Sequence, residues 1–227
     1  MTRVHVLCEG PTEETFTDKV LAPSLHARGV YLYPRLFGGI GGDVRWPRIR
    51  RDILASLKSD RGAVCTTLID YYGRGPGFPD EEATRRAGTT AGRKQALEDA
   101  MMRDIAAVIG EHEARQRFMP YVQMYEFEGL LFAGTDALAR VLEVNNDDAD
   151  SRIAAELRAQ RAEFVTPEDI NDGPTTAPSK RILRICPSYQ KISDGTLVAA
   201  QLTIAAIRAE CPLFGAWVTR LEALAGG

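Results

Sequence analysis

The stretch Val4-His5-Val6-Leu7-Cys8-Glu9-Gly10-Pro11-Thr12-Glu13-Glu14 predicts how the chain begins to fold. Its opening residues are mostly apolar and indicate a short buried strand. The chain then turns at Gly10, and Pro11 suits the first position of a helix, where the missing N–H leaves no hydrogen bond unmade. We therefore expect Glu9 at the carboxyl end of a strand and Glu13 in the first turn of the next helix. In open α/β sheets, ligands bind outside the carboxyl ends of the strands.

These acidic residues have an ordinary interpretation and a functional one. The helix macrodipole favours acids in a first turn, which accounts for Glu13 and Glu14. It does not account for Glu9, because a charge buried at the end of a strand needs a partner. Two carboxylates four residues apart that bracket a turn can also face one point in space. From this stretch alone, both interpretations stay open.

Similar apolar runs alternate with amphipathic helical patterns along the first 133 residues. Strands are expected at residues 4–8, 30–37, 63–69 and 118–125, and helices at 12–26, 47–59 and 90–112. Pro23 is expected to kink or end the first helix. The alternation predicts an α/β fold with a mostly parallel sheet and helices on both faces. Residues 1–133 would form this domain, and residues 134–227 a helical C-terminal region packed on it, with helices near 135–142, 150–163, 196–209 and 212–224.

The composition excludes several classes of protein. The 227 residues are 44% hydrophobic and 26% charged, which is ordinary for a globular protein. The net charge of −3 argues against a generally basic nucleic-acid binder, so nucleic acid would need a local basic patch, a metal or a partner protein. Four scattered cysteines favour free thiols in a reducing cytosol over disulfides or a zinc site. Neither a membrane span nor a signal peptide is indicated, so we expect a cytoplasmic protein without membrane contact.

Acidic residues follow two more strands. Asp70 comes directly after the third strand, and Glu126 and Glu128 follow the fourth. Because parallel strands end at one edge, these carboxylates would meet Glu9 and Glu13 there and raise one another's pKa values. A hard cation, Mg²⁺ or Mn²⁺, would relieve the repulsion, and two such ions could stabilise both reacting oxygens in phosphodiester cleavage. The alternative is that Asp70 caps the next helix and that Glu126 or Glu128 is exposed. The predicted metal ligands are Glu9, Glu13, Asp70, Glu126 and Glu128.

Basic residues gather in the C-terminal half. Lys180 and Arg181 are candidates for holding a substrate phosphate, and Lys191, expected in a loop before Asp194-Gly195, for a catalytic role on the leaving oxygen. The alternative is that Ser179 caps a short helix and that the basic residues are solvated or paired with acids. Arg48 and Arg51, at the start of the second helix, form either a phosphate-contacting patch or a solvated helix face. Bases could also stack on tyrosines, which could equally pack in the core or loops: Tyr71, Tyr72 and Tyr189.

The Glu9-Gly10-Pro11-Thr12-Glu13 motif, Asp70 and the order of elements resemble the TOPRIM fold of topoisomerases, bacterial primases and OLD-family nucleases. In OLD-type nucleases an E-G-x-[ST]-E motif supplies two metal-binding glutamates, which match Glu9 and Glu13. The family's aspartate after the third strand matches Asp70. Many TOPRIM proteins have Asp-x-Asp there, whereas this chain has Asp70-Tyr71-Tyr72, so the resemblance supplies no second aspartate and leaves a second metal open.

Four stretches carry a closer resemblance, to an uncharacterised family of bacterial TOPRIM-like proteins: EGPTE, IDYYG, YEFEGLLF (125–132) and APSKRI (177–182). The likeness covers nearly the whole chain, although Tyr125 stands where relatives often have histidine. Such proteins are often encoded beside an ABC- or AAA-type ATPase, in what look like phage-defence loci. The resemblance implies a metal-dependent nuclease that cleaves DNA or RNA as an effector of anti-phage defence, with an ATPase partner.

Two other functions stay open. The chain could be a non-catalytic partner or sensor subunit of an ATPase complex. It could also be a phosphoryl-transfer enzyme for a small nucleotide, because DNA, RNA and nucleotides present the same phosphate to the same carboxylates. The sequence decides neither the substrate nor whether the protein forms a homo-oligomer.

Overall fold

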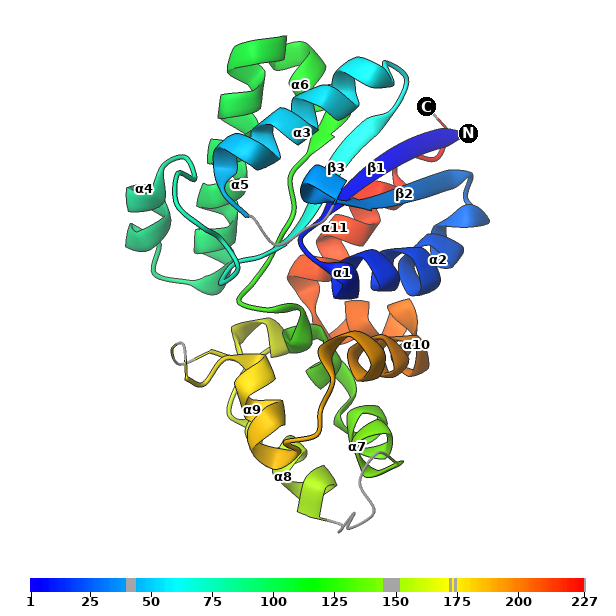
Figure 1. Ribbon diagram of the computed structural model, residues 1–227, viewed down its shortest axis with the longest axis vertical. Helices are drawn as coiled ribbons and strands as arrows, with labels where there is room; N and C mark the ends of the chain where they lie inside the picture. The colour runs from blue at the N-terminus through cyan, green and yellow to red at the C-terminus, as the bar shows by residue number, and fades with distance from the viewer. Residues whose placement is uncertain (40–43, 145–151, 172, 174, 227) are drawn as a thin grey trace.

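A parallel β-sheet forms the centre of the α/β part of the molecule (Figure 1). The computed structural model describes residues 1–39, 44–144, 152–171, 173 and 175–226. The strand order is β2-β1-β3-β4, with β5 also paired to β3, and every pairing is parallel. The strands are β1 (Thr2–Cys8), β2 (Val30–Leu36), β3 (Val64–Asp70), β4 (Phe118–Met119) and β5 (Val122–Gln123). This sheet confirms the expected fold class.

Helices cover both faces of the sheet, as the alternation predicted (Figure 1). One face packs against α1 (Pro11–Phe16), α2 (Ala22–His26) and α11 (Pro212–Glu222), and the other against α3 (Trp46–Ser59), α5 (Thr90–Ile109) and α6 (Glu111–Arg117). Successive side chains of β1 point to opposite faces. Val6 and Cys8 therefore join Phe16 in one apolar cluster, whereas Leu7 joins Ile49 in the other. A short helix, α4 (Glu81–Arg86), precedes α5, and a 3₁₀ turn, η2 (Phe37–Gly39), follows β2.

The first helical segment runs from Pro11 to His26 and does not end at Pro23. A π-helical turn, η1 (Thr17–Leu21), joins α1 to α2, and the Ala22 N–H donates to the Thr17 carbonyl. Proline cannot donate a backbone hydrogen bond, and a π-turn is one way in which a helix accommodates a local mismatch. Pro23 thus lies in the first turn of α2, and the helix continues for three more residues.

The strand expected at residues 118–125 is divided into β4 and β5. Pro120 lies between them and has no N–H to give to a ladder. Hydroxyls from β3 replace the missing pairing: Thr66 Oγ1 donates to the Met119 carbonyl (2.6 Å) and Thr67 Oγ1 to the Tyr121 carbonyl (2.8 Å). After the break only the short strand β5 precedes the acidic segment.

The outer side of β5 is completed by a buried ion pair from α5. Glu98 Oε1 accepts from the Val122 N–H (2.8 Å), and Lys94 Nζ donates to the Val122 carbonyl (3.0 Å). Lys94 and Glu98 also pair with each other. Buried backbone groups need partners, and here two side chains supply them.

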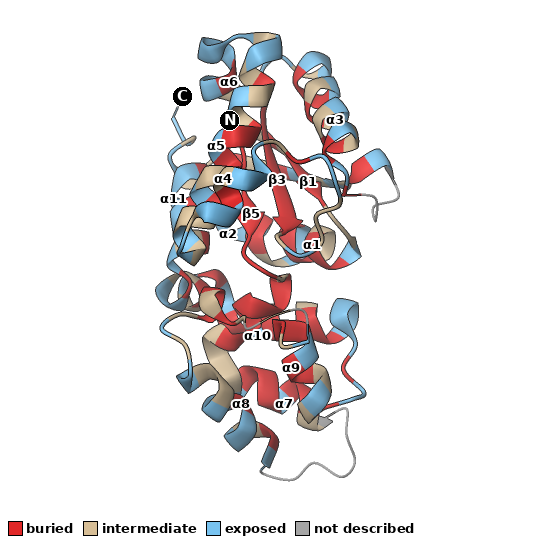
Figure 2. Cartoon of the chain, turned by 90° about the vertical axis from the view of Figure 1, so that its left-hand side faces the viewer, coloured by how far each residue is buried: buried red, intermediate tan, exposed pale blue. Residues whose placement is uncertain are grey.

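The helical C-terminal region lies beyond the carboxyl edge of the sheet (Figures 1 and 2). It contains η3 (Phe127–Gly134), α7 (Thr135–Val144), α8 (Arg152–Ala162), η4 (Pro167–Asp169), α9 (Pro178–Ile185) and α10 (Lys191–Glu210). Residues 150 and 151 of one expected helix lie outside the described residues. The helix expected from residue 196 begins earlier, so Lys191 lies on α10 and not in a loop. Asp194 Oδ2 accepts from the Gln190 N–H (2.7 Å) and so stabilises this earlier start.

The last helix returns to the sheet. Trp217 Nε1 donates to Thr66 Oγ1 (3.0 Å), and the Trp217 ring stacks on Tyr121 with centroids 4.2 Å apart. One apolar cluster extends from β1 to α7, α10 and α11. The C-terminal helix therefore completes a layer of the α/β part, and the domain boundary after residue 133 stays a prediction.

Within the described residues, no single helix is long and apolar enough to cross a membrane. The pair α10 and α11, bent by 102°, meets the length and composition requirement only when the two helices are taken together. Many of their apolar side chains, including Val198 and Phe214, are buried in the main cluster, whereas Ile192 and Leu197 of α10 are exposed.

Candidate active site

Acidic side chains gather where β1 and β3 end. Glu9 follows β1, Asp70 is the last residue of β3, and Glu13 lies in the first turn of α1. Glu9 Oε2 accepts a hydrogen bond from the Asp70 N–H (2.9 Å), which joins the two strand ends. Glu13 Oε2 accepts from the Gly10 N–H (3.0 Å). The structure thus brings these three predicted residues to one edge of the sheet.

The two acids after β5 have different partners. Glu128 is 1% exposed, and its Oε1 lies 3.1 Å from Lys191 Nζ. Glu126 has an extended backbone, and its Oε2 accepts from the Ser179 N–H (2.8 Å) at the start of α9. Glu128 therefore belongs to the buried acidic group, and Glu126 also fixes a helix of the C-terminal region.

Burial and mutual repulsion raise the pKa values of the acids. Burial, with the charges of Glu9 and Glu128, raises the pKa of Glu13 to about 8. Burial, with the charges of Glu13, Glu9 and Glu128, raises the pKa of Asp70 well above its ordinary value. Burial also raises the pKa of Glu9, against the opposing effects of the Asp70 N–H and the Lys191 ammonium. If all of these carboxylates were ionised, the positive charge around them would not neutralise their negative charge.

The donor chemistry of this edge fits a hard divalent cation. Its polar side chains are carboxylates, whose oxygens Mg²⁺ and Mn²⁺ prefer. Asp70 Oδ1 is buried and has no hydrogen-bond partner among the described residues. As the side chains are placed, no three His, Cys, Asp or Glu residues of the described part of the chain are close enough together to hold a metal ion. Binding would therefore require these side chains to draw closer.

Lys191 places a cation beside the acids. It is the first residue of α10, and about half of its side chain is exposed. Burial lowers the pKa of Lys191, but the charges of Glu128 and Glu126 outweigh it, so that the pKa is raised overall. The ammonium is therefore firmly protonated at neutral pH and close to the candidate site.

The surroundings of Arg181 favour the alternative to substrate contact, in which the basic residue is paired with an acid. The residue is 6% exposed, its Nε donates to the Thr176 carbonyl (2.9 Å), and its guanidinium pairs with Glu163 (3.2 Å). The guanidinium carbon also lies 4.9 Å from the centre of the Phe164 ring. Its role is therefore to hold the C-terminal region together. The neighbouring Lys180 is exposed on α9 and stays a candidate for substrate contact.

The predicted arginines of α3 line a cavity of about 430 Å³ together with Arg45 and Pro47. Arg48 donates to the Phe37 carbonyl (3.1 Å), and the exposed Arg51 lies 3.6 Å from a carboxylate oxygen of Asp52. Because α3 follows β2 in a parallel sheet, its first turn lies on the carboxyl side. The Gly75 N–H donates to the Val44 carbonyl (3.1 Å) and so joins the loop after β3 to this segment.

Gly73 is a further residue of the site; it is the last residue of the IDYYG stretch, but the sequence alone assigns it no role. A Cβ atom at this position would collide with the carboxylate of Glu9. Only glycine therefore lets the loop after β3 cross so close to that side chain. The signal in the sequence that could have found Gly73 is its place three residues after Asp70, the aspartate at the strand end.

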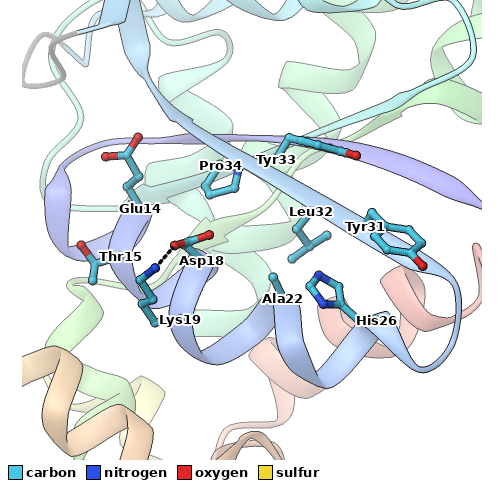
Figure 3. Close-up of a pocket in the computed structure, with 10 residues that line it drawn as sticks. All are labelled: Glu14, Thr15, Asp18, Lys19, Ala22, His26, Tyr31, Leu32, Tyr33 and Pro34. Atoms are coloured by element: carbon cyan, nitrogen blue, oxygen red, sulfur yellow. Dashed lines mark ion pairs between the residues drawn. The ribbon is translucent and has the colours of Figure 1, made fainter.

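A second hollow, of about 610 Å³, lies along the outer strand β2 (Figure 3). Helix side chains such as Glu14 and Lys19 line one side, and Tyr31 and Tyr33 of β2 line the other. Lys19 pairs with Asp18 at 2.7 Å. Its described lining includes none of the predicted site residues, so the hollow is separate from the acidic edge.

The fold and the site define an α/β protein with a parallel sheet, an acidic carboxyl edge and a helical C-terminal region over that edge. The chain belongs to the family described as domain of unknown function DUF4276, whose model matches residues 8–222. Among curated proteins, none matches its sequence.

Two solved structures are similar to it. The C-terminal region of the OLD protein of Burkholderia pseudomallei is 12% identical, with a TM-score of 0.52 over 100% of both chains. The C-terminal region of the OLD protein of Xanthomonas campestris pv. campestris is 14% identical, with a TM-score of 0.45 over 97% of each chain. The likeness to the first structure confirms, at the level of the fold, the expected resemblance to OLD proteins.

Proposed function

We propose that the protein is a metal-dependent nuclease that hydrolyses phosphodiester bonds in DNA or RNA. The observation that carries this proposal is the group of buried carboxylates at the carboxyl edge, with raised pKa values and an unpartnered oxygen on Asp70. Each acid has a local partner, such as the Gly10 N–H for Glu13 and the Asp70 N–H for Glu9, but these hydrogen bonds do not offset the repulsion between buried like charges. The likeness in fold to the C-terminal region of an OLD protein supports the same function.

In this proposal Glu9, Glu13, Asp70 and Glu128 hold Mg²⁺ or Mn²⁺. When bound, the ion polarises a phosphoryl oxygen and stabilises the charge that develops on it. Glu9 and Glu13 each give one oxygen to a backbone N–H and keep the other for a ligand. These hydrogen bonds orient the carboxylates before substrate arrives.

Lys191 is the chain's own source of positive charge at the reacting phosphate. Its Nζ is 3.1 Å from Glu128, and half of the side chain is exposed, so the ammonium can face both the acids and a substrate. A fixed ammonium stabilises negative charge on the leaving oxygen. We propose this catalytic role for Lys191.

Substrate binding is proposed for Lys180, Arg48 and Arg51. A chain of net charge −3 with an acidic edge repels nucleic acid at long range, so local cations are needed to hold the phosphates. Lys180 is exposed on α9, and the two arginines line the cavity at the start of α3. These three cations come from two different parts of the chain, α3 and α9.

The test is incubation of the purified protein with Mg²⁺ or Mn²⁺ against plasmid, single-stranded DNA and RNA. We expect cleavage by the native chain, none in EDTA and none by Glu13→Gln. Glu14→Gln is the matched control, because Glu14 lies in the same helical turn and lines the hollow along β2. Absence of cleavage by the native chain, or equal cleavage by native and Glu13→Gln protein, would refute the proposal.

A second candidate function is a non-catalytic subunit that docks on an ATPase. The chain covers the whole of a structure that is itself the C-terminal region of a larger protein. We therefore propose an ABC- or AAA-type ATPase as a partner and anti-phage defence in the cytoplasm as the setting. A phage-challenge assay in cells that carry the intact locus separates the two functions, because a docking subunit would protect fully as Glu13→Gln and a nuclease would not.

A further inference from the structure

Three tyrosines form a cluster beside the acidic edge. Tyr71 and Tyr72 directly follow Asp70, and Tyr125 directly precedes Glu126. The ring centroids are 5.3 Å apart for Tyr72 and Tyr125, 5.9 Å for Tyr71 and Tyr125, and 6.0 Å for Tyr71 and Tyr72. The Tyr72 N–H donates to the Tyr125 carbonyl (3.0 Å), which holds the two segments together. The cluster is therefore built into the same backbone as the acids.

The cluster is strained at one residue and exposed at another. Tyr125 is 4% exposed and has a φ of +61°, a conformation that a bulky residue adopts rarely. Strained backbone of this kind concentrates at functional sites. Tyr72 leaves 36% of its surface exposed, and its hydroxyl is hydrogen-bonded to the side-chain oxygen of Asn171. Tyr72 is thus a fixed aromatic ring within reach of a ligand.

Arginines flank the cluster. The guanidinium of Arg74 lies 4.0 Å from the centre of the Tyr71 ring. Arg93 donates from its Nη1 to the Tyr125 hydroxyl (3.5 Å) and from its Nε to the Ala87 carbonyl (3.1 Å). Arg93 and Tyr125 also line a hollow of about 650 Å³, whose other described walls include Thr89, Thr90, Val165, Asp169 and Asn171. Aromatic rings with arginines beside them match the π-faces of bases and the charge of phosphates.

We infer that this tyrosine cluster is a nucleobase-stacking subsite and that it selects single-stranded nucleic acid. The inference rests on the nuclease function proposed above, because it names the substrate of that site. An unpaired base exposes its π-face, whereas a base in a duplex is covered by its neighbours. A base stacked on Tyr72 would sit beside the carboxylates, and Arg93 would face an adjacent phosphate.

Binding is measured in EDTA, so that no cleavage occurs. The probes are fluorescein-labelled single-stranded DNA and RNA oligonucleotides and a duplex of the same sequence, followed by fluorescence anisotropy. The native chain should bind the single strands more tightly than the duplex, and Tyr72→Ala should weaken single-strand binding by about 5- to 100-fold, the usual effect of losing one stacked base. Tyr72→Phe keeps the ring and should bind like the native chain. Tyr33→Ala, which removes a tyrosine of similar exposure on β2, is the matched control and should also bind like the native chain.

Cleavage with Mg²⁺ is assayed on the same proteins, and their melting temperatures are compared. Cleavage by the native chain together with unchanged binding by Tyr72→Ala would overturn the subsite and leave the nuclease standing. No cleavage by any protein, together with the loss of single-strand binding in Tyr72→Ala, would end the nuclease proposal and leave the subsite standing. Equal native affinity for single strands and duplex, or no binding at all, would overturn the inferred substrate class.

Discussion

Replacing Glu13 with glutamine is expected to stabilise the metal-free protein at alkaline pH. Glu13 is 6% exposed, and burial with the charges of Glu9 and Glu128 raises its pKa from 4.5 to about 8. The folded pKa therefore lies above the unfolded one, so the folded state binds the proton more tightly. Its contribution to stability is fully present below about pH 4.5 and is lost as the pH rises through about 8. Glutamine has no charge to lose.

The size of this stability change follows from the difference between the ordinary and the folded pKa of Glu13. A tenfold change in proton affinity is worth about 1.4 kcal/mol, so a rise from 4.5 to about 8 amounts to at most about 5 kcal/mol of stability lost above pH 8. Glutamine keeps nearly the same volume, and its carbonyl can still accept from the Gly10 N–H, with a weaker hydrogen bond that costs about 1 kcal/mol. The variant should therefore gain up to about 4 kcal/mol at pH 9. For a chain of this length, each kcal/mol raises the melting temperature by about 2–4 °C.

Urea unfolding in EDTA at pH 5 and pH 9 measures this difference. The native chain should lose more stability between the two values than Glu13→Gln, and Glu14→Gln should behave like the native chain. Mn²⁺ should raise the melting temperature of the native chain much more than that of Glu13→Gln. The reason is that the ion, like the proton, neutralises the charge of the buried acids. An identical pH dependence in native and Glu13→Gln proteins would refute the reasoning.

Three further changes test other parts of the site. Calorimetric titration with Mn²⁺ should show no binding to a Glu9→Gln, Asp70→Asn double variant, and heats equal to those of the native chain would remove the metal site. Lys180→Ala should weaken binding to duplex DNA and flatten its salt dependence by about 0.9 per lost phosphate contact, whereas Arg181→Ala should lower the melting temperature, because its guanidinium is buried and paired. An unchanged salt slope would take Lys180 out of substrate binding. Gly73→Ala should abolish cleavage by displacing the Glu9 carboxylate, and native activity would contradict the close approach seen there.

The order of strands and helices was predictable because it depends on local patterns. Short runs of apolar residues mark the strands, such as Val6-Leu7-Cys8 in β1 and Leu68-Ile69 in β3, and the apolar residues of an amphipathic helix repeat every three or four positions. The division of the fourth strand was predictable only in part, because Pro120 is a local signal and the hydroxyl groups that fill the gap are not. Its break depends on Pro120 and on hydroxyls of Thr66 and Thr67, which are distant in the sequence and near only in the fold. The earlier start of α10 depends instead on a local contact, because Asp194 accepts from the Gln190 N–H four residues before it.

The same distinction separates the site residues. Glu9, Glu13 and Asp70 were predictable because a strand end or a first helical turn fixes each of them. The burial of Arg181 was not, because its partners, Thr176 and Glu163, become neighbours only when the C-terminal region folds. A basic side chain in a polar stretch has the same local pattern whether it faces substrate or holds helices together.

The acidic residues repel one another, but one of them also holds the edge of the sheet together. The Glu9 carboxylate accepts the Asp70 N–H, so the acid itself joins the end of β1 to the end of β3. This hydrogen bond favours the ionised form of Glu9, and burial opposes it. The Lys191 ammonium also favours ionisation. The Asp70 N–H and the Lys191 ammonium thus offset only part of the cost of ionising Glu9, whose pKa stays raised. A divalent cation at this edge would supply the positive charge that is missing.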